Sequence, residues 1–88
     1  MVTAFTPTCW EDYMYWQQND PDVVVKFSDL IKDIKRDPFK GIGKPEPLRG
    51  NLAGWWSRRI TREHRLVYKI EVTSPNQTLT IIQARFHY

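Results

Sequence analysis

Apolar residues recur at helical spacing in two stretches near the beginning of the sequence. The first, "TCWEDYMYWQQN" (residues 8–19), opens with a capping box, in which Thr8 caps the first turn and Glu11, three residues later, reaches back to it. The spacing predicts a helix of about three turns. Its inward face is expected to carry Trp10, Tyr13, Met14 and Gln17.

The second helical pattern is "NDPDVVVKFSDLIKDIKRDP" (residues 19–38). Asp20 is placed as the N-cap and Pro21 at the first helical position, and the helix must end near Pro38. Its apolar face consists of Val23, Phe27, Leu30, Ile31 and Ile34. Its water-facing side consists of Lys26, Asp29, Lys32, Asp33 and Lys35. Because the link between the helices is short, we expect an antiparallel helical hairpin.

β-Branched and aromatic residues dominate the other regular segments. Strands are predicted for "VTAF" (2–5), "WWSRRI" (55–60), "HRLVYKIEV" (64–72) and "TLTIIQARFH" (78–87). The segment 39–54, rich in glycine and proline, is expected to be a loop, and "TSPNQ" (73–77) a turn. These elements predict an α+β fold in which the helical hairpin covers one face of a small antiparallel sheet.

The composition sets limits on this picture. With 88 residues, the chain has room for a single domain, residues 1–88, with one modest core. The longest apolar run is "VVV" at 23–25, and there is no signal-peptide pattern, so we expect a cytoplasmic protein. Cys9 is the single cysteine and has no partner for a disulfide or a metal cluster, so it is interpreted as a small buried hydrophobe.

The net charge of +3 is unevenly distributed along the chain. Residues 1–43 carry five Lys/Arg against seven Asp/Glu, residues 44–69 carry seven against two, and the remainder carries one of each. The basic middle segment indicates a localised anion-binding face, because concentrated charge steers polyanions better than dispersed charge. A solvated basic rim would give the same counts, so charge alone leaves both interpretations open.

A short hairpin between two predicted strands brings two arginines together. A three-residue loop over 61–63 would place Ile60 opposite His64. Arg59 would then lie directly opposite Arg65 on the same side of the sheet. Like charges in this position are destabilising unless an anion lies between them, and a phosphate suits the guanidinium geometry. A register slip of one residue would separate the two side chains.

Glu46 is the only acidic residue between Phe39 and Arg62. Pro45 and Pro47 flank it and restrict the backbone, so a stiff loop presents the carboxylate, as a positioned general base requires. The alternative is a surface loop whose prolines only reduce the entropy of the unfolded chain.

His64 and His87 are the two histidines. His64, at the start of a predicted strand, is interpreted as structural. Alternation along the last predicted strand places Arg85 and His87 on one face. Phe86 and Tyr88 fall on the other face. Because histidine changes its charge near neutral pH, His87 is a candidate general acid beside a basic groove, and a structural role is the alternative.

Together, these candidates are sufficient for one reaction. A ribose 2′-hydroxyl would attack its own 3′-phosphodiester, with proton transfer by Glu46 and His87 and stabilisation of the phosphate by arginines. The reaction needs no metal and no cofactor. The sequence also contains no pattern of a metal-ligand cluster, a nucleophilic triad or a glycine-rich phosphate loop.

The segment "GIGKPEPLRGNLAGWWSRRITREHRLVYKI" (41–70), together with "FHY" (86–88), closely resembles the YoeB (Txe) toxins of bacterial type II toxin–antitoxin systems, within the RelE superfamily. "WEDYMYWQQND" and "LIKDIKRDPF" extend the similarity over nearly the whole chain. The resemblance implies a RelE-like, microbial-ribonuclease-like fold and an mRNA endonuclease that acts in the ribosomal A site. It also implies neutralisation by a YefM/Axe-type antitoxin, and it allows a homodimer.

In the terms of this family, Glu46 would be the general base, Arg65 the main phosphate stabiliser and His87 the general acid. Arg59 would support the phosphate, and Tyr88 would orient the base or the leaving side. The other basic candidates for substrate binding are Lys44, Arg49 and Arg58.

The sequence departs from the family pattern at two positions. Phe86 lacks the hydroxyl of the usual tyrosine, and Arg49 stands where a lysine is common. Two other functions stay open from the residues alone. One is a non-catalytic RNA- or ribosome-binding module in which Glu46 and His87 are incidental, and the other is an interaction domain whose basic groove binds an acidic peptide.

Overall fold

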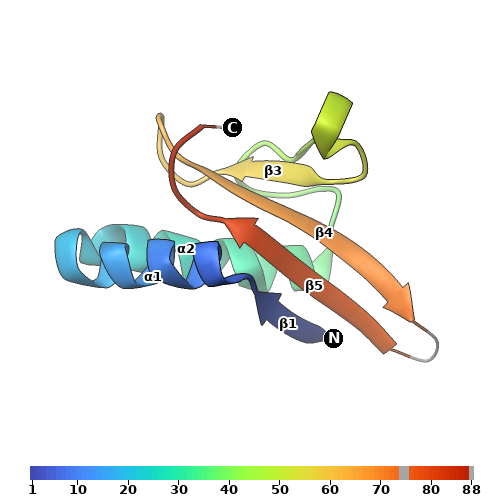
Figure 1. Ribbon diagram of the computed structural model, residues 1–88, viewed down its shortest axis with the longest axis horizontal. Helices are drawn as coiled ribbons and strands as arrows, with labels where there is room; N and C mark the ends of the chain where they lie inside the picture. The colour runs from blue at the N-terminus through green and yellow to red at the C-terminus, as the bar shows by residue number, and fades with distance from the viewer. Residues whose placement is uncertain (74–75, 88) are drawn as a thin grey trace.

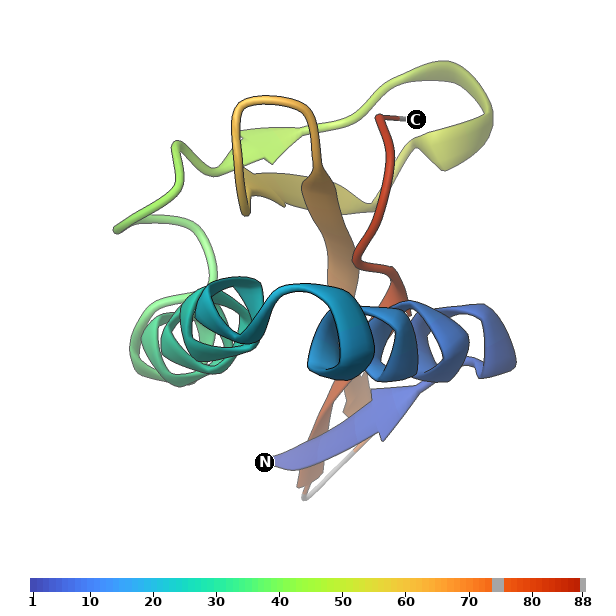
Figure 2. The same ribbon diagram turned by 90° about the vertical axis from the view of Figure 1, so that its left-hand side faces the viewer.

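The computed structural model describes residues 1–73 and 76–87, in which two α-helices lie against a twisted five-stranded sheet (Figure 1). Seen from the end, the two helices lie side by side in front of the sheet (Figure 2). The predicted α+β fold with a helical hairpin is therefore confirmed. In chain order the elements are β1 (Val2–Phe5), α1 (Pro7–Asn19), α2 (Pro21–Arg36), β2 (Glu46–Pro47), the short 3-10 helix η1 (Gly50–Leu52), β3 (Trp56–Arg59), β4 (Arg65–Thr73) and β5 (Asn76–Gln83).

The sheet has the strand order β1-β5-β4-β3-β2. The pairs from β2 to β5 are antiparallel, as predicted, but β1 runs parallel to β5, so a wholly antiparallel sheet was the wrong prediction for this edge. β1 is joined to the other strands through both helices and not through a hairpin. Thr6 fixes the pairing directly after β1, because its N–H donates to the Ile81 carbonyl at 3.1 Å and its Oγ1 donates to the Ile82 carbonyl at 2.9 Å.

The apolar face of α2 packs on the sheet as predicted. Its helix follows Asp20 and stops at Arg36, ahead of Pro38. The buried residues of α2 are Val23, Phe27, Leu30 and Ile34. They form one core with residues of β4 and β5 that include Leu66, Tyr68, Leu79 and Ile81. No helix in the described part of the chain is long and apolar enough to cross a bilayer.

The first helix begins at Pro7, and its N-cap is Thr6 instead of the predicted Thr8. The Oγ1 of Thr6 accepts a hydrogen bond from the Cys9 N–H at 3.2 Å. Pro7 occupies the first helical position, where an N–H would have no partner within the helix, so its absence costs no hydrogen bond. Cys9 is fully buried, as predicted. This burial, with a smaller contribution from the Asp12 carboxylate, raises the pKa of the thiol to about 12.

The inward face of α1 differs from the predicted one. Trp10 and Met14 are 51% and 38% exposed, whereas the buried residues of the helix are Cys9, Asp12 and Trp16. Aromatic residues lie on both sides of this helix, and its sheet-facing side contains the Asp12 carboxylate. The pattern of polar and apolar residues therefore predicted the wrong inward face. Burial of Asp12 is compatible with the fold because the carboxylate accepts a 3.0 Å hydrogen bond from the Ala84 N–H.

Candidate active site

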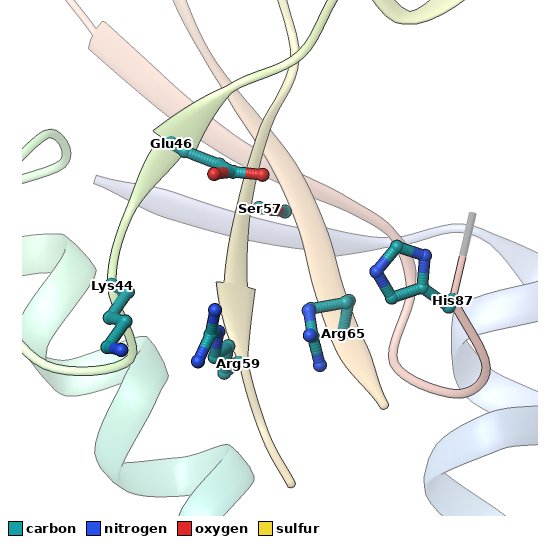
Figure 3. A pocket seen from close by; sticks show the side chains of 6 residues that line it. All are labelled: Lys44, Glu46, Ser57, Arg59, Arg65 and His87. Carbon is teal, nitrogen blue, oxygen red and sulfur yellow. The ribbon is translucent and has the colours of Figure 1, made fainter. Parts of the chain in front are cut away.

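A pocket of about 290 Å³ opens on the face of the sheet away from the helices (Figure 3). Figure 3 shows Glu46 and His87 entering it from opposite sides, with the arginine side chains of β3 and β4 next to each other. The lining residues are Lys44, Glu46, Ser57, Arg59, Arg65 and His87. Three separate parts of the chain therefore meet here: the loop into β2, the β3–β4 hairpin and the segment after β5.

The register of the hairpin is the one predicted from its loop length. Arg59 pairs with Arg65 across β3 and β4, and the Ile60 N–H donates to the His64 carbonyl at 3.0 Å. Glu46 pairs with Ser57 across β2 and β3. Because alternate residues of a strand share a face, Ser57 and Arg59 both point toward the pocket. The predicted proximity of the two guanidinium groups is confirmed.

The loop of the hairpin holds the side chain of Arg65 in place. Its Nη1 donates to the carbonyl oxygens of Thr61, Arg62 and His64 at 3.0, 3.1 and 3.1 Å. Thr61 shapes the same loop, since its Oγ1 accepts from the N–H groups of Glu63 and His64. One guanidinium nitrogen is thus fixed by the protein, and the rest of the planar group lies against the pocket.

Gly43 brings the Glu46 loop close to β3. Its φ is +78°, and its carbonyl accepts a 2.7 Å hydrogen bond from the Arg59 N–H. A Cβ at this position would lie 2.9 Å from Cδ2 of Leu30 and 3.0 Å from the Arg59 carbonyl oxygen, so a larger residue would push the loop away. Close backbone packing, followed by the proline-flanked segment, delivers Lys44 and Glu46 to the pocket.

Arg58 was predicted to bind substrate, and this prediction is wrong. Its side chain is 0% exposed because alternation along β3 turns it toward the helices, away from its neighbour Arg59. Nη1 bonds to Asp33 at 2.5 Å, and Nε donates to the Tyr68 hydroxyl at 3.1 Å. Further bonds from Nη1 and Nη2 reach three carbonyl oxygens of the loop after α2, those of Asp37, Lys40 and Ile42.

The role expected for Asp33 is corrected at the same time. The sequence placed it on the water-facing side of α2, but its side chain is only 10% exposed and accepts hydrogen bonds from Arg58, Arg36 and the Ile42 N–H. The bond from Arg58, followed by the other two, lowers the pKa of this carboxyl to about 2. Arg58 and Asp33 therefore fix the loop that precedes Lys44 and Glu46.

His87 reaches the pocket by a different route from the one predicted. β5 ends at Gln83, and Phe86 has a φ of +67°, so residues 84–87 turn away from the strand and do not alternate along it. Ala84 is anchored to α1 through bonds to Asp12 and Trp16, and the Arg85 guanidinium lies 3.4 Å from the centre of the Tyr15 ring. The backbone turn directs His87 to the pocket. Tyr88 lies outside the described residues, as does the centre of the predicted turn 73–77.

The other predicted basic residues have separate positions. Lys44 and Arg59 line the pocket that also holds His87, and Arg49 lies in a neighbouring hollow beside Glu46, Pro47 and Leu48. Three cationic side chains and one carboxylate line the pocket with His87, a balance that favours an anion. Among the described residues, there is no group of three or more His, Cys, Asp or Glu side chains arranged to hold a metal ion.

Sequence reasoning missed the residues that support the site. Ser57 lines the pocket, and the alternation that places Arg59 there could have identified it. The contacts of Asp12, Trp16 and His64 with the segment after β5 had no such signal, because they join residues that are far apart in the sequence.

The architecture defines a small helix-covered sheet with a basic pocket, and comparison with known proteins identifies its family. The family model for the YoeB-like toxin of bacterial type II toxin–antitoxin systems matches residues 5–88. The chain is 56% identical to Toxin YoeB of Synechocystis sp. and 54% identical to Toxin YoeB of Escherichia coli strain K12, covering all of this chain and 98% and 100% of theirs. The chain belongs to the YoeB-like toxin family.

Solved structures agree with this assignment. The YoeB/ParE toxin from Agrobacterium tumefaciens superposes with a TM-score of 0.95 at 52% identity, and both chains are covered completely. A YoeB dimer from Staphylococcus aureus gives 0.89 at 44% identity, and a heterotetrameric YoeB-YefM toxin–antitoxin complex from the same organism gives 0.87 at 44%. Each alignment to the S. aureus proteins covers all of this chain and 98% of the other.

Proposed function

We propose that this toxin is an endoribonuclease that cuts mRNA in the ribosomal A site and thereby inhibits translation in the cytoplasm. The observation that carries the proposal is the pocket that gathers one carboxylate, one imidazole and two opposed guanidinium groups. Membership of the YoeB-like family supports the same conclusion, because it is the activity that the sequence motifs imply. We take residues 1–88 as a single catalytic domain.

In the proposed reaction, the ribose 2′-oxygen attacks the adjacent phosphorus while Glu46 accepts the hydroxyl proton. The new P–O2′ bond forms as the P–O5′ bond breaks, and His87 gives a proton to the leaving 5′-oxygen. The products are a 2′,3′-cyclic phosphate and a 5′-hydroxyl. The entry of Glu46 and His87 from opposite sides of the pocket supports this division of roles, because attack and departure occur on opposite sides of the phosphorus (Figure 3).

Arg65 and Arg59 are proposed to stabilise the charge on the phosphoryl oxygens. An anion between the two opposed guanidinium groups relieves their repulsion, and the dianionic transition state gains more from this arrangement than the monoanionic substrate. Lys44 adds a third cation, and Arg49 in the neighbouring hollow is placed to contact the RNA backbone beyond the cut. Tyr88 would orient the base or the leaving side. No step requires a metal ion.

A YefM-type antitoxin is the proposed regulator. The S. aureus relative has been solved in a YoeB-YefM complex, and the basic segment 44–69 of this chain suits an acidic partner segment that becomes ordered on binding. Binding should therefore weaken with salt, and Arg62→Glu, at an exposed position, should weaken both binding and neutralisation. The solved S. aureus dimer makes a homodimer the assembly to test by analytical ultracentrifugation.

The test of the function is a cleavage assay with programmed ribosomes, with and without EDTA. We expect new mRNA ends within the A-site codon, a cyclic or hydrolysed 2′,3′-phosphate on the upstream fragment, a 5′-hydroxyl downstream, and no effect of the chelator. Substrate with a 2′-deoxy sugar at the cut site should bind and stay intact. Protection of RNA without new ends would instead identify a binding module, and 3′-hydroxyl with 5′-phosphate ends would mean that water is the nucleophile.

A further inference from the structure

His64 lies outside the pocket, yet it holds the backbone that leads to His87. The Nδ1 atom of its ring accepts a 2.8 Å hydrogen bond from the N–H of Phe86. The next residue, Arg65, donates its own N–H to the Phe86 carbonyl oxygen at 3.0 Å. Two adjacent residues of the β3–β4 hairpin therefore hold both sides of the Phe86 backbone, one residue before His87.

The protonation state of His64 follows from this bond. A backbone N–H is always a donor, so Nδ1 must be unprotonated, and a neutral ring carries its proton on Nε2. A charged ring would place an N–H at Nδ1, facing the N–H of Phe86, and the bond would be lost. The hydrogen bond can exist only while His64 is neutral.

The backbone at Phe86 depends on these contacts. Its φ of +67° lies in the left-handed region, which is unfavourable for a residue that carries a side chain. The residue is 58% exposed, and its ring has the His64 ring as a neighbour at 6.1 Å between centres and the Arg85 guanidinium at 4.4 Å from the ring centre. The His64 ring is itself fixed, because it packs edge-on against Trp16 with 4.8 Å between ring centres. Trp16 in turn donates to the Ala84 carbonyl at 2.8 Å.

We propose that neutral His64 is a positioning residue for His87: its Nδ1 fixes the Phe86 turn, and through that turn the imidazole that the proposed function assigns as general acid. The inference rests on the proposed function for its effect on cleavage, but its structural part stands apart from it. Protonation of His64 would release the turn and let His87 leave the pocket.

Several charged groups surround His64. Asp12 of α1 attracts a charged His64 ring, and this attraction acts to lower the pKa of the Asp12 carboxyl. Arg65 follows His64 directly, and Arg85 lies in the segment that the two hydrogen bonds hold. Glu63 precedes His64 on the exposed loop.

Two substitutions of His64 separate its role as a hydrogen-bond acceptor from its ability to take up a proton. His64→Asn places an amide oxygen where Nδ1 lies and does not titrate, whereas His64→Ala removes the acceptor. At pH 7.5 we expect His64→Asn to keep most of the cleavage rate, and His64→Ala to lose roughly tenfold to a hundredfold in kcat, the usual cost of a small displacement of a catalytic group. Glu63→Gln, next to it on the loop, is the matched control and should retain the wild-type rate.

The structural readout is the amide ¹H–¹⁵N signal of Phe86, followed from pH 8 to pH 5. In the wild type it should move together with the ring signals of His64; in His64→Asn it should stay constant, and in His64→Ala it should lie at the released position at every pH. A Phe86 signal that ignores His64, or equal rates for the Asn and Ala variants, would overturn the proposal. If the wild type does not cleave RNA, the proposed function fails while the titration still tests the positioning role.

Discussion

Arg58 and Asp33 form a 2.5 Å ion pair between strand β3 and helix α2, and the arginine is fully buried. Arg59, the next residue in the chain, lines the pocket. The loop whose carbonyl groups bond to Arg58 leads to Glu46. One strand therefore carries a pocket-lining guanidinium and a structural one at consecutive positions.

The first prediction concerns the stability of this ion pair. Arg58→Ala should lower the free energy of unfolding by about 3–5 kcal/mol, because it leaves a poorly solvated carboxylate and loop carbonyl groups without their donor. Urea unfolding followed by tryptophan fluorescence measures the change. The control is Arg62→Ala, on the exposed hairpin loop, which should stay within about 0.5 kcal/mol of the wild type. Equal stabilities of the two variants would contradict the structural role of Arg58.

The second prediction is a pH dependence. Because the pKa of the Asp33 carboxyl is lowered to about 2, its ionised form is favoured in the folded state. Its contribution is fully present above the ordinary carboxyl pKa of about 4 and is lost as the pH falls toward 2. The melting temperature of the wild type should therefore approach that of Asp33→Asn between pH 5 and pH 2.5. A constant difference over this range would mean that Asp33 does not titrate as described.

The pKa of the Asp12 carboxyl is shifted in the opposite direction, so its contribution to stability changes with pH in the opposite sense. Burial raises the pKa of this carboxyl, so ionisation is disfavoured in the folded state and its contribution to stability decreases as the pH rises through the raised value. Asp12→Asn should therefore make the acid side of the stability profile steeper, because it removes a group that favours the folded state at low pH. Comparing the two Asn variants separates the two carboxyls.

The third prediction separates charge stabilisation from anchoring at Arg65. Arg65→Ala should reduce the cleavage rate more than it weakens ribosome or RNA association, because the phosphoryl group carries more negative charge in the proposed transition state than in the substrate. Arg65→Lys should rescue poorly, since an ammonium group lacks the planar fork that the Thr61 and Arg62 carbonyls hold from one side. Single-turnover rates and binding constants measured on the same complex give the comparison. Equal losses of binding and rate would indicate simple anchoring.

The fourth prediction concerns the proposed base and acid. Glu46→Gln and His87→Gln should each slow single-turnover cleavage by roughly a hundredfold or more, with melting temperatures close to the wild-type value. The double variant should lose less than the product of the two, because groups that act in one step are not additive. An unchanged rate for Glu46→Gln would remove the base assignment without removing the nuclease, since ribosomal groups would then take the proton.

The parts of the fold and of the site that could be predicted from the sequence are those that residues close together in the chain determine. The length of a three-residue loop fixed the pairing of Arg59 with Arg65, and a regular apolar stripe identified the buried face of α2. The inward face of α1 was missed because a buried carboxylate there bonds to Ala84, a partner 72 residues away. Arg58 was misplaced because a charged residue in a basic run looks exposed until the strand's alternation and the position of Asp33 are known.

Ala84 donates its N–H to Asp12 and accepts a hydrogen bond from Trp16, so these bonds join residues that are 72 and 68 positions apart, and the parallel β1–β5 pairing also joins distant parts of the chain. Contacts between residues so far apart in the sequence are expected to form late in folding, because closing a long loop costs entropy before the contacts that it allows can form. A partly folded chain would then hold the arginine hairpin, which is local, before it holds His87. In such a chain the pairing of Arg59 with Arg65 would exist before the segment that brings His87 to the pocket is in place. A newly made toxin would on this view be open to capture by its inhibitor before it becomes a nuclease.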